Sequence, residues 1–244
     1  MIICVHGFNF EPGSKHNDPK TFFNQISRAL GEAVKGHPWH SGRLSFKGWL
    51  KAWSHGYVHP YRHGWALADA EARRLALVIN SQCSPVNVIC HSLGSRVLFQ
   101  SLRYVEKHRI ERVIILNGAE LVPEAEKALA CHGWKHSRLN ILNVAVSTDD
   151  ILDKLGSWTS GSGNAPCIGN AGLKHKKVVS ITLDSLEDQR IAARNGWLLR
   201  GDDAHDYGDH HFSYLCRDNW PLYRAFFAGN NLADFRSSHA NAND

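Results

Sequence analysis

Ser92 is the residue of this chain whose setting best suits nucleophilic chemistry. It lies in the stretch Val86 to Val97, which reads VNVICHSLGSRV. The β-branched residues before it favour a buried parallel strand, and Ser95 to Val105 carries apolar residues at helical spacing. A tight turn from strand to helix directs its central side chain outward, beside the unpaired N–H groups that begin the helix. We therefore predict a serine hydroxyl at the carboxyl end of a sheet.

The five residues from Cys90 to Gly94 resemble the nucleophile elbow of the α/β-hydrolases, G-x-S-x-G, with Cys90 in place of the first glycine. A side chain at that position faces a crowded turn, so the cysteine introduces a mild strain. Gly94 keeps the second small position, and Ser95 also lets the helix approach the strand. The resemblance implies an α/β fold: a mostly parallel central sheet of about six strands with helices on both faces, without the extra leading strands of many family members.

The amino terminus supplies a second special turn. Ile2 to Val5 is a short apolar run that ends in His6-Gly7-Phe8-Asn9. Ligands collect beyond the carboxyl ends of parallel strands, so this turn and the serine turn belong to one site. In the family, a His-Gly pair at this place contributes to an oxyanion hole, which implies roles for the backbone N–H groups of Phe8 and Leu93. The alternative is that His6-Gly7 simply ends a strand.

A serine hydroxyl attacks only when a base takes its proton and a carboxylate orients that base. The family order is serine, acid, histidine. Asn140 to Val146 predicts a buried strand that leads into Asp149 and Asp150, followed by Ile151 and Leu152. This pattern resembles the family's acid segment, which implies Asp149 as the acid, with Asp150 as the alternate. Either aspartate also suits the N-cap of a helix starting at Ile151.

The histidine should follow the last strand, which we predict at Lys177 to Leu183. Before the C-terminal helix the chain reads YGDHHFSY from Tyr207 to Tyr214, and Gly208 marks a turn. This segment resembles the G-D-H…Y ending of some serine hydrolases, which implies His210 as the base. His211 is the alternate, because adjacent loop residues are not ranked by sequence.

Other histidines raise the question of a metal. His55, His59 and His63 are four residues apart, a spacing that would suit metal ligands on one helical face. Gly56 and Pro60 are expected to interrupt such a helix. We therefore expect no metal here, and the implied reaction requires no cofactor.

The remaining segments define the frame around these residues. We predict amphipathic helices at Thr21 to Val34 and Trp65 to Ile79, and a strand at Arg112 to Leu116 that ends in Asn117-Gly118 near the active face. Between the helices, residues 36–64 are rich in aromatic residues and must contain a strand. This segment either wraps over the core or lines a pocket for the substrate. Residues 156–172 form a Gly/Ser-rich loop near the same face, and we hypothesise that it gates access.

Length and composition fit one α/β-hydrolase domain over residues 1–244, since 43% of the 244 residues are hydrophobic. The net charge of +5, with 28 basic and 23 acidic residues, does not require nucleic-acid binding, although acidic polymers or anionic lipids would suit it. We expect no membrane span and, because the first strand begins at once, no cleavable signal peptide. The six cysteines are expected to stay reduced, in a cytoplasmic protein.

The resemblance implies a serine esterase that cleaves carboxylic esters through an acyl-enzyme. Ser92 attacks, His210 transfers the proton, and Asp149 orients the imidazole. The partner is then a small-molecule or lipid-like ester, and thioesters, lipids and amides are alternatives on the same scaffold. A non-catalytic binding or scaffold protein with this fold is the alternative from a different class.

Overall fold

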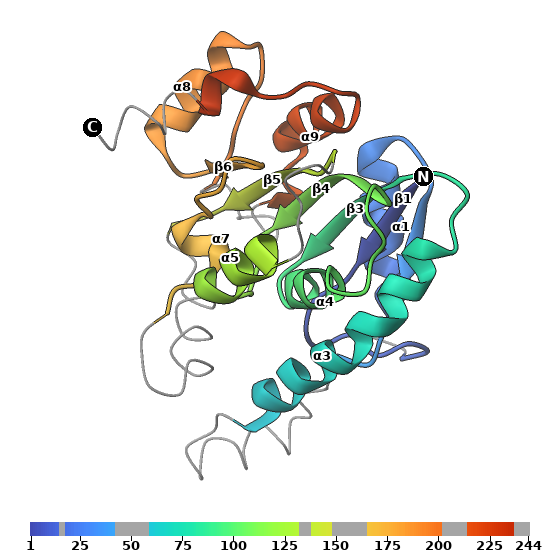
Figure 1. Cartoon of the computed structure of the whole chain (residues 1–244). Helices are drawn as coiled ribbons and strands as arrows, with labels where there is room; N and C mark the ends of the chain where they lie inside the picture. Colours follow the sequence, from blue (N-terminus) through green and yellow to red (C-terminus); the bar gives the residue numbers. More distant parts are fainter. Residues whose placement is uncertain (15–17, 42–58, 132–137, 148–164, 202–213, 237–244) are drawn as a thin grey trace.

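The computed structural model describes residues 1–14, 18–41, 59–131, 138–147, 165–201 and 214–236. Within these residues, six strands form one sheet in the order β2-β1-β3-β4-β5-β6, and every neighbouring pair is parallel (Figure 1). The strands are β1 (Ile2–Val5), β2 (Val34–His37), β3 (Val86–His91), β4 (Ile110–Leu116), β5 (Asn140–Ala145) and β6 (Val178–Thr182). The prediction of an α/β fold with about six strands is confirmed.

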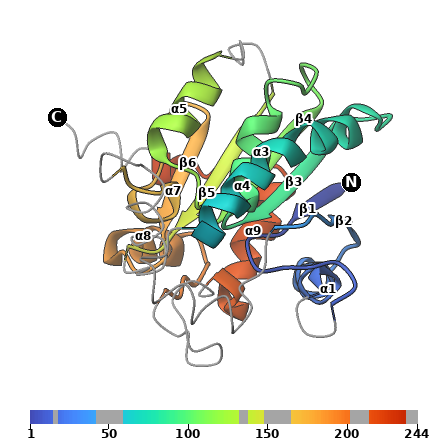
Figure 2. The ribbon, with the colours of Figure 1, turned by 90° about the horizontal axis from the view of Figure 1, so that it is seen from below.

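Helices cover both faces of this sheet, because each parallel connection must cross back over it. The helical elements are α1 (Pro19–Leu30), α3 (His59–Asn80), α4 (Gly94–Ser101), α5 (Val122–Cys131), α7 (Ile168–Ala171), α8 (Leu186–Arg194), the 3₁₀ turn η4 (Arg217–Asn219) and α9 (Trp220–Phe227). Figure 2 shows α3, α4 and α5 on one face and α1 and α9 on the other. The sheet is therefore the middle layer of three.

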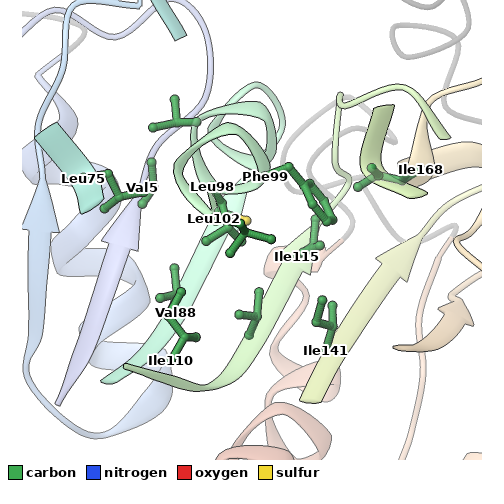
Figure 3. Packing of buried hydrophobic residues seen from close by; sticks show 14 of the residues in the cluster. Val5, Leu75, Val88, Leu98, Phe99, Leu102, Ile110, Ile115, Ile141 and Ile168 are labelled. Carbon is green, nitrogen blue, oxygen red and sulfur yellow. The ribbon is translucent and has the colours of Figure 1, made fainter. Parts of the chain in front are cut away.

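The core is divided between the two faces by the alternation of side chains along each strand. Val88 and Cys90 of β3 belong to the apolar cluster under α3 and α4, whereas Ile89 belongs to the cluster under α1, α8 and α9. Figure 3 shows Leu98 of α4, and Leu102 directly after that helix, turned toward the strands of the first cluster. Strands buried on both faces explain the nearly continuous apolar runs in the sequence.

The first helix ends earlier than its apolar spacing predicted. Gly31 adopts a left-handed backbone with φ of 75°, and its N–H donates to the carbonyls of Ser27 and Arg28. This C-cap stops the helix after Leu30. Val34, predicted as the end of the helix, instead begins β2, which overlaps the segment 36–64 only at Gly36 and His37. Residues 42–58 of that segment, where a strand was also expected, lie outside the described residues.

The prediction that Pro60 interrupts a helix was wrong for the described part of this segment. Pro60 is the second residue of α3, which is longer than the predicted Trp65 to Ile79. A proline in the first turn lacks only an N–H that would have no helical partner. His55 and Gly56 lie outside the described residues, within which no group of three or more His, Cys, Asp or Glu side chains is placed to hold a metal ion.

All six cysteines lie in described segments, and each is a free thiol. No helix in the described ranges is both long enough and apolar enough to cross a membrane. Of the predicted loop at 156–172, residues 156–164 lie outside the description. Its last part contains α7, and Cys167 directly before that helix forms an isolated antiparallel bridge with Leu121.

Candidate functional site

The strand order reverses between β1 and β3, at the centre of the candidate site. From β1 the chain passes through α1 to β2 on one side, and α3 then returns it over the opposite face to β3 on the other side. At such a switch point the two connections diverge and leave a crevice beyond the carboxyl ends of the strands. The turn at His6-Gly7-Phe8 and the turn at Ser92 are the turns that follow these two strands.

Ser92 has the backbone conformation of a tight strand-to-helix turn. Its φ is 50°, a left-handed value that is unfavourable for a residue with a side chain by about 1–2 kcal/mol. Its N–H donates to the Leu116 carbonyl at 3.0 Å, so the turn continues the pairing of β3 with β4. Only 3% of the Ser92 surface is exposed, because the turn after β1 lies directly against it.

Two glycines allow these turns to touch. A β-carbon on Gly7 would lie 2.8 Å from the Ser92 β-carbon, and one on Gly94 would lie 2.7 Å from the carbonyl oxygens of Val5 and His6. Both distances are shorter than real contacts of this kind, so any side chain would separate the turns. Each turn therefore carries a glycine that faces the other.

The peptide group between Ser92 and Leu93 is held through its carbonyl oxygen. The Ser92 carbonyl oxygen accepts hydrogen bonds from the Ser95 N–H at 3.0 Å, the Ser95 hydroxyl at 2.7 Å and the Ala119 N–H at 3.0 Å. In a planar trans peptide the N–H points opposite to the C=O. The Leu93 N–H is thus directed away from Ser95 and Ala119.

In the turn after β1, a buried histidine likewise binds a backbone carbonyl oxygen. The Trp39 N–H donates to His6 Nε2 at 3.1 Å, so Nε2 is the acceptor and Nδ1 carries the proton. Nδ1 then donates to the Gly7 carbonyl at 2.8 Å, which fixes the Gly7–Phe8 peptide and the direction of the Phe8 N–H. Burial lowers the pKa of His6 to about 4, which keeps the ring neutral at pH 7.

Trp39 fixes the ring from a second direction. Its indole stacks on the His6 ring with centroids 5.5 Å apart, and its Nε1–H donates to the His6 carbonyl. Trp39 is 1% exposed and belongs to the core. Of the two roles considered for the aromatic segment 36–64, Trp39 therefore fills the structural one.

A charge network that is buried at Arg96 and Glu120 lies behind the serine turn. Arg96 of α4 contacts the Glu120 carboxylate at 3.0 Å and Asp69 of α3 at 2.9 Å, and its guanidinium lies over the Trp65 ring at 4.0 Å. Burial raises the pKa of Glu120 to about 7, against the opposing effect of Arg96. The Glu120 N–H donates to the Ser95 hydroxyl at 3.0 Å, which connects this network to the turn.

The proposed acids, Asp149 and Asp150, lie outside the described residues. The chain is described up to Ser147, two residues before Asp149. There the Ser147 N–H and hydroxyl donate to the two carboxylate oxygens of Asp184, at 2.9 and 2.6 Å. The chain that leaves β5 toward the two aspartates is therefore anchored to the end of β6.

The proposed bases, His210 and His211, also lie outside the described residues. The next described residue is Tyr214, four residues after His210. Tyr214 is fully buried, and its ring centroid is 4.7 Å from that of His91, the residue immediately before Ser92. The chain that follows the two histidines thus returns to the serine turn.

Sequence reasoning missed the residues that support the turns. Ser95 was noted only for its small size, and neither Arg96 nor Glu120 was considered. The available signal was a charged residue within an otherwise apolar stretch, as at Glu120 between Ala119 and Leu121. A charge that is buried in this way requires a partner, which Arg96 supplies.

A separate groove of about 930 Å³ lies along α1 and α9. It is lined by Thr21, Gln25, Arg28, Ala29, Gly196, Trp197, Leu198, Leu215, Arg217, Asp218, Trp220, Pro221 and Arg224. Among the described site residues, Ser92, Phe8 and Leu93 do not line this groove.

Comparison with known proteins yields no family. No family model matches the chain, and no curated protein matches it. A solved structure that resembles it is the crystal structure of an uncharacterised protein from Capnocytophaga ochracea DSM 7271, with 12% sequence identity and a TM-score of 0.36. The match covers 76% of this chain and 51% of the other, so the chain spans about half the length of that protein.

Proposed function

We propose that this protein is a serine hydrolase of the α/β-hydrolase type that cleaves carboxylic esters. The observation that carries the proposal is the turn at Ser92, whose φ of 50° places a serine between β3 and α4 at the switch point of the sheet. A strained turn at a ligand-binding crevice is a feature that function, rather than stability, accounts for.

In the proposed reaction, the oxygen of the Ser92 hydroxyl attacks the ester carbonyl carbon, and the carbonyl oxygen of the ester becomes negatively charged. The Phe8 and Leu93 N–H groups would stabilise that charge. This role is supported by the hydrogen bonds to the Gly7 and Ser92 carbonyls, which fix the orientation of both peptide groups. The acyl group stays on Ser92 while the alcohol leaves, and water then releases the acid.

His210 is proposed as the base that takes the Ser92 proton, gives it to the leaving alcohol and then activates water. Asp149 is proposed to orient the imidazole, with Asp150 and His211 as the alternates. The contact between Tyr214 and His91 supports the histidine assignment, and the anchoring of Ser147 on Asp184 supports the approach of the acid segment. Thioesters, lipids and amides are the alternative substrates on the same scaffold.

The proposal is tested with a fluorophosphonate probe and a series of p-nitrophenyl esters of increasing acyl length. We expect labelling of Ser92 and turnover that falls by roughly 10⁴-fold or more in Ser92→Ala. Thermal unfolding of the variant serves as the control for folding. If the folded wild-type protein is neither labelled nor active on any ester, a non-catalytic binding or scaffold role replaces the proposal.

The two pairs of alternates are separated by single substitutions. His210→Ala and His211→Ala should differ, and the inactive variant identifies the base. Asp149→Asn and Asp150→Asn are compared in the same assay. Full activity of His210→Ala would assign the base to His211, and full activity of Asp149→Asn would assign the acid to Asp150.

A further inference from the structure

We propose that Ser95 is a positioning residue for the oxyanion hole, because its hydroxyl fixes the peptide group that presents the Leu93 N–H. This inference rests on the proposed function and adds a residue to it. Ser95 is fully buried in the first turn of α4 and would not touch the substrate.

The direction of each hydrogen bond at this hydroxyl is determined by its partners. The Glu120 N–H can only donate, so the Ser95 oxygen accepts there at 3.0 Å. The Ser92 carbonyl can only accept, so the Ser95 hydroxyl proton points to it at 2.7 Å. The hydroxyl therefore links the backbone that follows β4 to the serine turn that follows β3.

This link acts on the Leu93 N–H through the planarity of the peptide. Rotation of the Ser92–Leu93 peptide would move the N–H and the carbonyl together, in opposite directions. The Ser95 hydroxyl resists that rotation, together with the N–H groups of Ser95 and Ala119. Preorganised donors act because they need not reorient as charge develops, so a looser peptide lowers kcat more than it changes substrate binding.

The second support comes from the ion pair behind the turn. The Glu120 carboxylate accepts a hydrogen bond from Arg96 at 3.0 Å and another from the Leu121 N–H at 2.9 Å. These bonds fix both the side chain of Glu120 and the backbone that follows it. Its backbone N–H is consequently presented to Ser95 in one orientation. Arg96 lies next to Ser95 in α4, which makes the turn, the helix and the end of β4 one connected unit.

The chain contains a matched control for this hydroxyl. Ser101 is also fully buried in α4, and its hydroxyl donates to the Leu98 carbonyl three residues earlier at 2.7 Å. This bond has the same residue spacing and length as that from Ser95 to Ser92, but it lies at the other end of the helix. Loss of Ser101 thus removes a donated bond of the same kind without affecting the serine turn, whereas loss of Ser95 also removes the acceptor of the Glu120 N–H.

The experiment compares Ser95→Ala with Ser101→Ala by ester kinetics, fluorophosphonate labelling rate and thermal unfolding. We expect Ser95→Ala to lower kcat by about tenfold and to change KM by less than about twofold. Removal of a direct oxyanion donor lowers kcat by about 10²–10³-fold, and Ser95 only positions such a donor. Ser101→Ala should keep the wild-type kcat, and Ser95→Ala should lower the Tm further than Ser101→Ala, because it also removes the acceptor of the buried Glu120 N–H. Ser95→Cys and Ser101→Cys preserve more of the packing and provide the same comparison if an alanine variant does not fold.

Two results would overturn the inference while leaving the proposed function intact. One is an unchanged kcat in folded Ser95→Ala and Ser95→Cys, and the other is an equal loss of kcat in the Ser101 variants. A wild-type protein without labelling or turnover would instead overturn the proposed function, and this inference with it.

Discussion

In each of the turns after β1 and β3, a hydrogen bond to a backbone carbonyl oxygen fixes one peptide group, but the donors are different chemical groups. After β1, the Gly7 carbonyl accepts from the His6 ring, whereas after β3 the Ser92 carbonyl accepts from a hydroxyl and two amides. An imidazole titrates in the range that proteins encounter, and hydroxyl and amide groups do not. The two turns should therefore respond differently to pH.

The largest expected effect is on the turn after β1. The pKa of His6 is lowered from 6.5 to about 4, so the unfolded chain binds its proton more readily than the folded protein does. The contribution of His6 to stability is therefore complete above pH 6.5 and is lost as the pH falls toward 4, by about 3 kcal/mol in total. Urea unfolding at a series of pH values measures this loss. In His6→Gln, which does not titrate, the decline between pH 6.5 and 4 should be smaller, and an identical decline would contradict the assignment.

The contact between the two turns is tested at Gly94. In Gly94→Ala the new β-carbon would meet the backbone oxygens of Val5 and His6, which cannot move aside as a side chain can. We expect destabilisation by about 2–3 kcal/mol, together with reduced ester turnover. Gly118→Ala is the control, because the atoms nearest to its β-carbon would be side-chain atoms of Ile115 and Ile168. A similar effect of the two substitutions on unfolding and turnover would argue against a close fit between the turns.

Glu120 gives the region behind the second turn a pH dependence of opposite sign. Its pKa is raised from 4.5 to about 7, mainly by burial, so the folded protein binds the proton more readily than the unfolded chain. Its contribution to stability therefore falls as the pH rises from 4.5 to 7. Compared with wild type, Glu120→Gln should become relatively more stable with increasing pH across this window. A constant difference in unfolding free energy between the two proteins would show that Glu120 does not titrate there.

The smallest effect concerns the strain at Ser92. Glycine adopts a φ of 50° without the steric penalty of a side chain, so Ser92→Gly should be more stable than Ser92→Ala by about 1 kcal/mol. Neither variant retains the hydroxyl, so both should be inactive on esters. Chemical denaturation measures the difference, and a less stable glycine variant would mean that the turn is not strained.

Much of the fold could be predicted because its signals are local. The β-branched run before Ser92 and the apolar spacing after it predicted β3 and α4 within a few residues of their observed bounds. The errors occurred where a single residue overrode a pattern. Gly31 ended the first helix while the apolar spacing still continued to Val34, and Pro60 was compatible with a helix because it lies in the first turn of α3.

The candidate site was only partly predictable, because some of its features depend on adjacent residues and others on contacts between distant segments. The serine turn and the His-Gly turn could be identified from adjacent residues, but the support given by Ser95, Trp39 and Glu120 could not. Ser95 and Glu120 are 25 positions apart, and His6 and Trp39 are 33 apart. Such contacts depend on how the strands are ordered, about which neighbouring residues carry little information.

The sequence by itself determined the strand-to-helix turn at Ser92, the apolar strands and the small residues at Gly7 and Gly94. Backbone preference and side-chain size act between neighbours along the chain, so the local sequence determines these features. The tertiary structure decided that β1 and β3 are adjacent, that His6 is buried and neutral, and that the Ser95 hydroxyl reaches the Ser92 carbonyl. Burial, pKa and hydrogen bonding of this kind arise only when distant segments exclude water together.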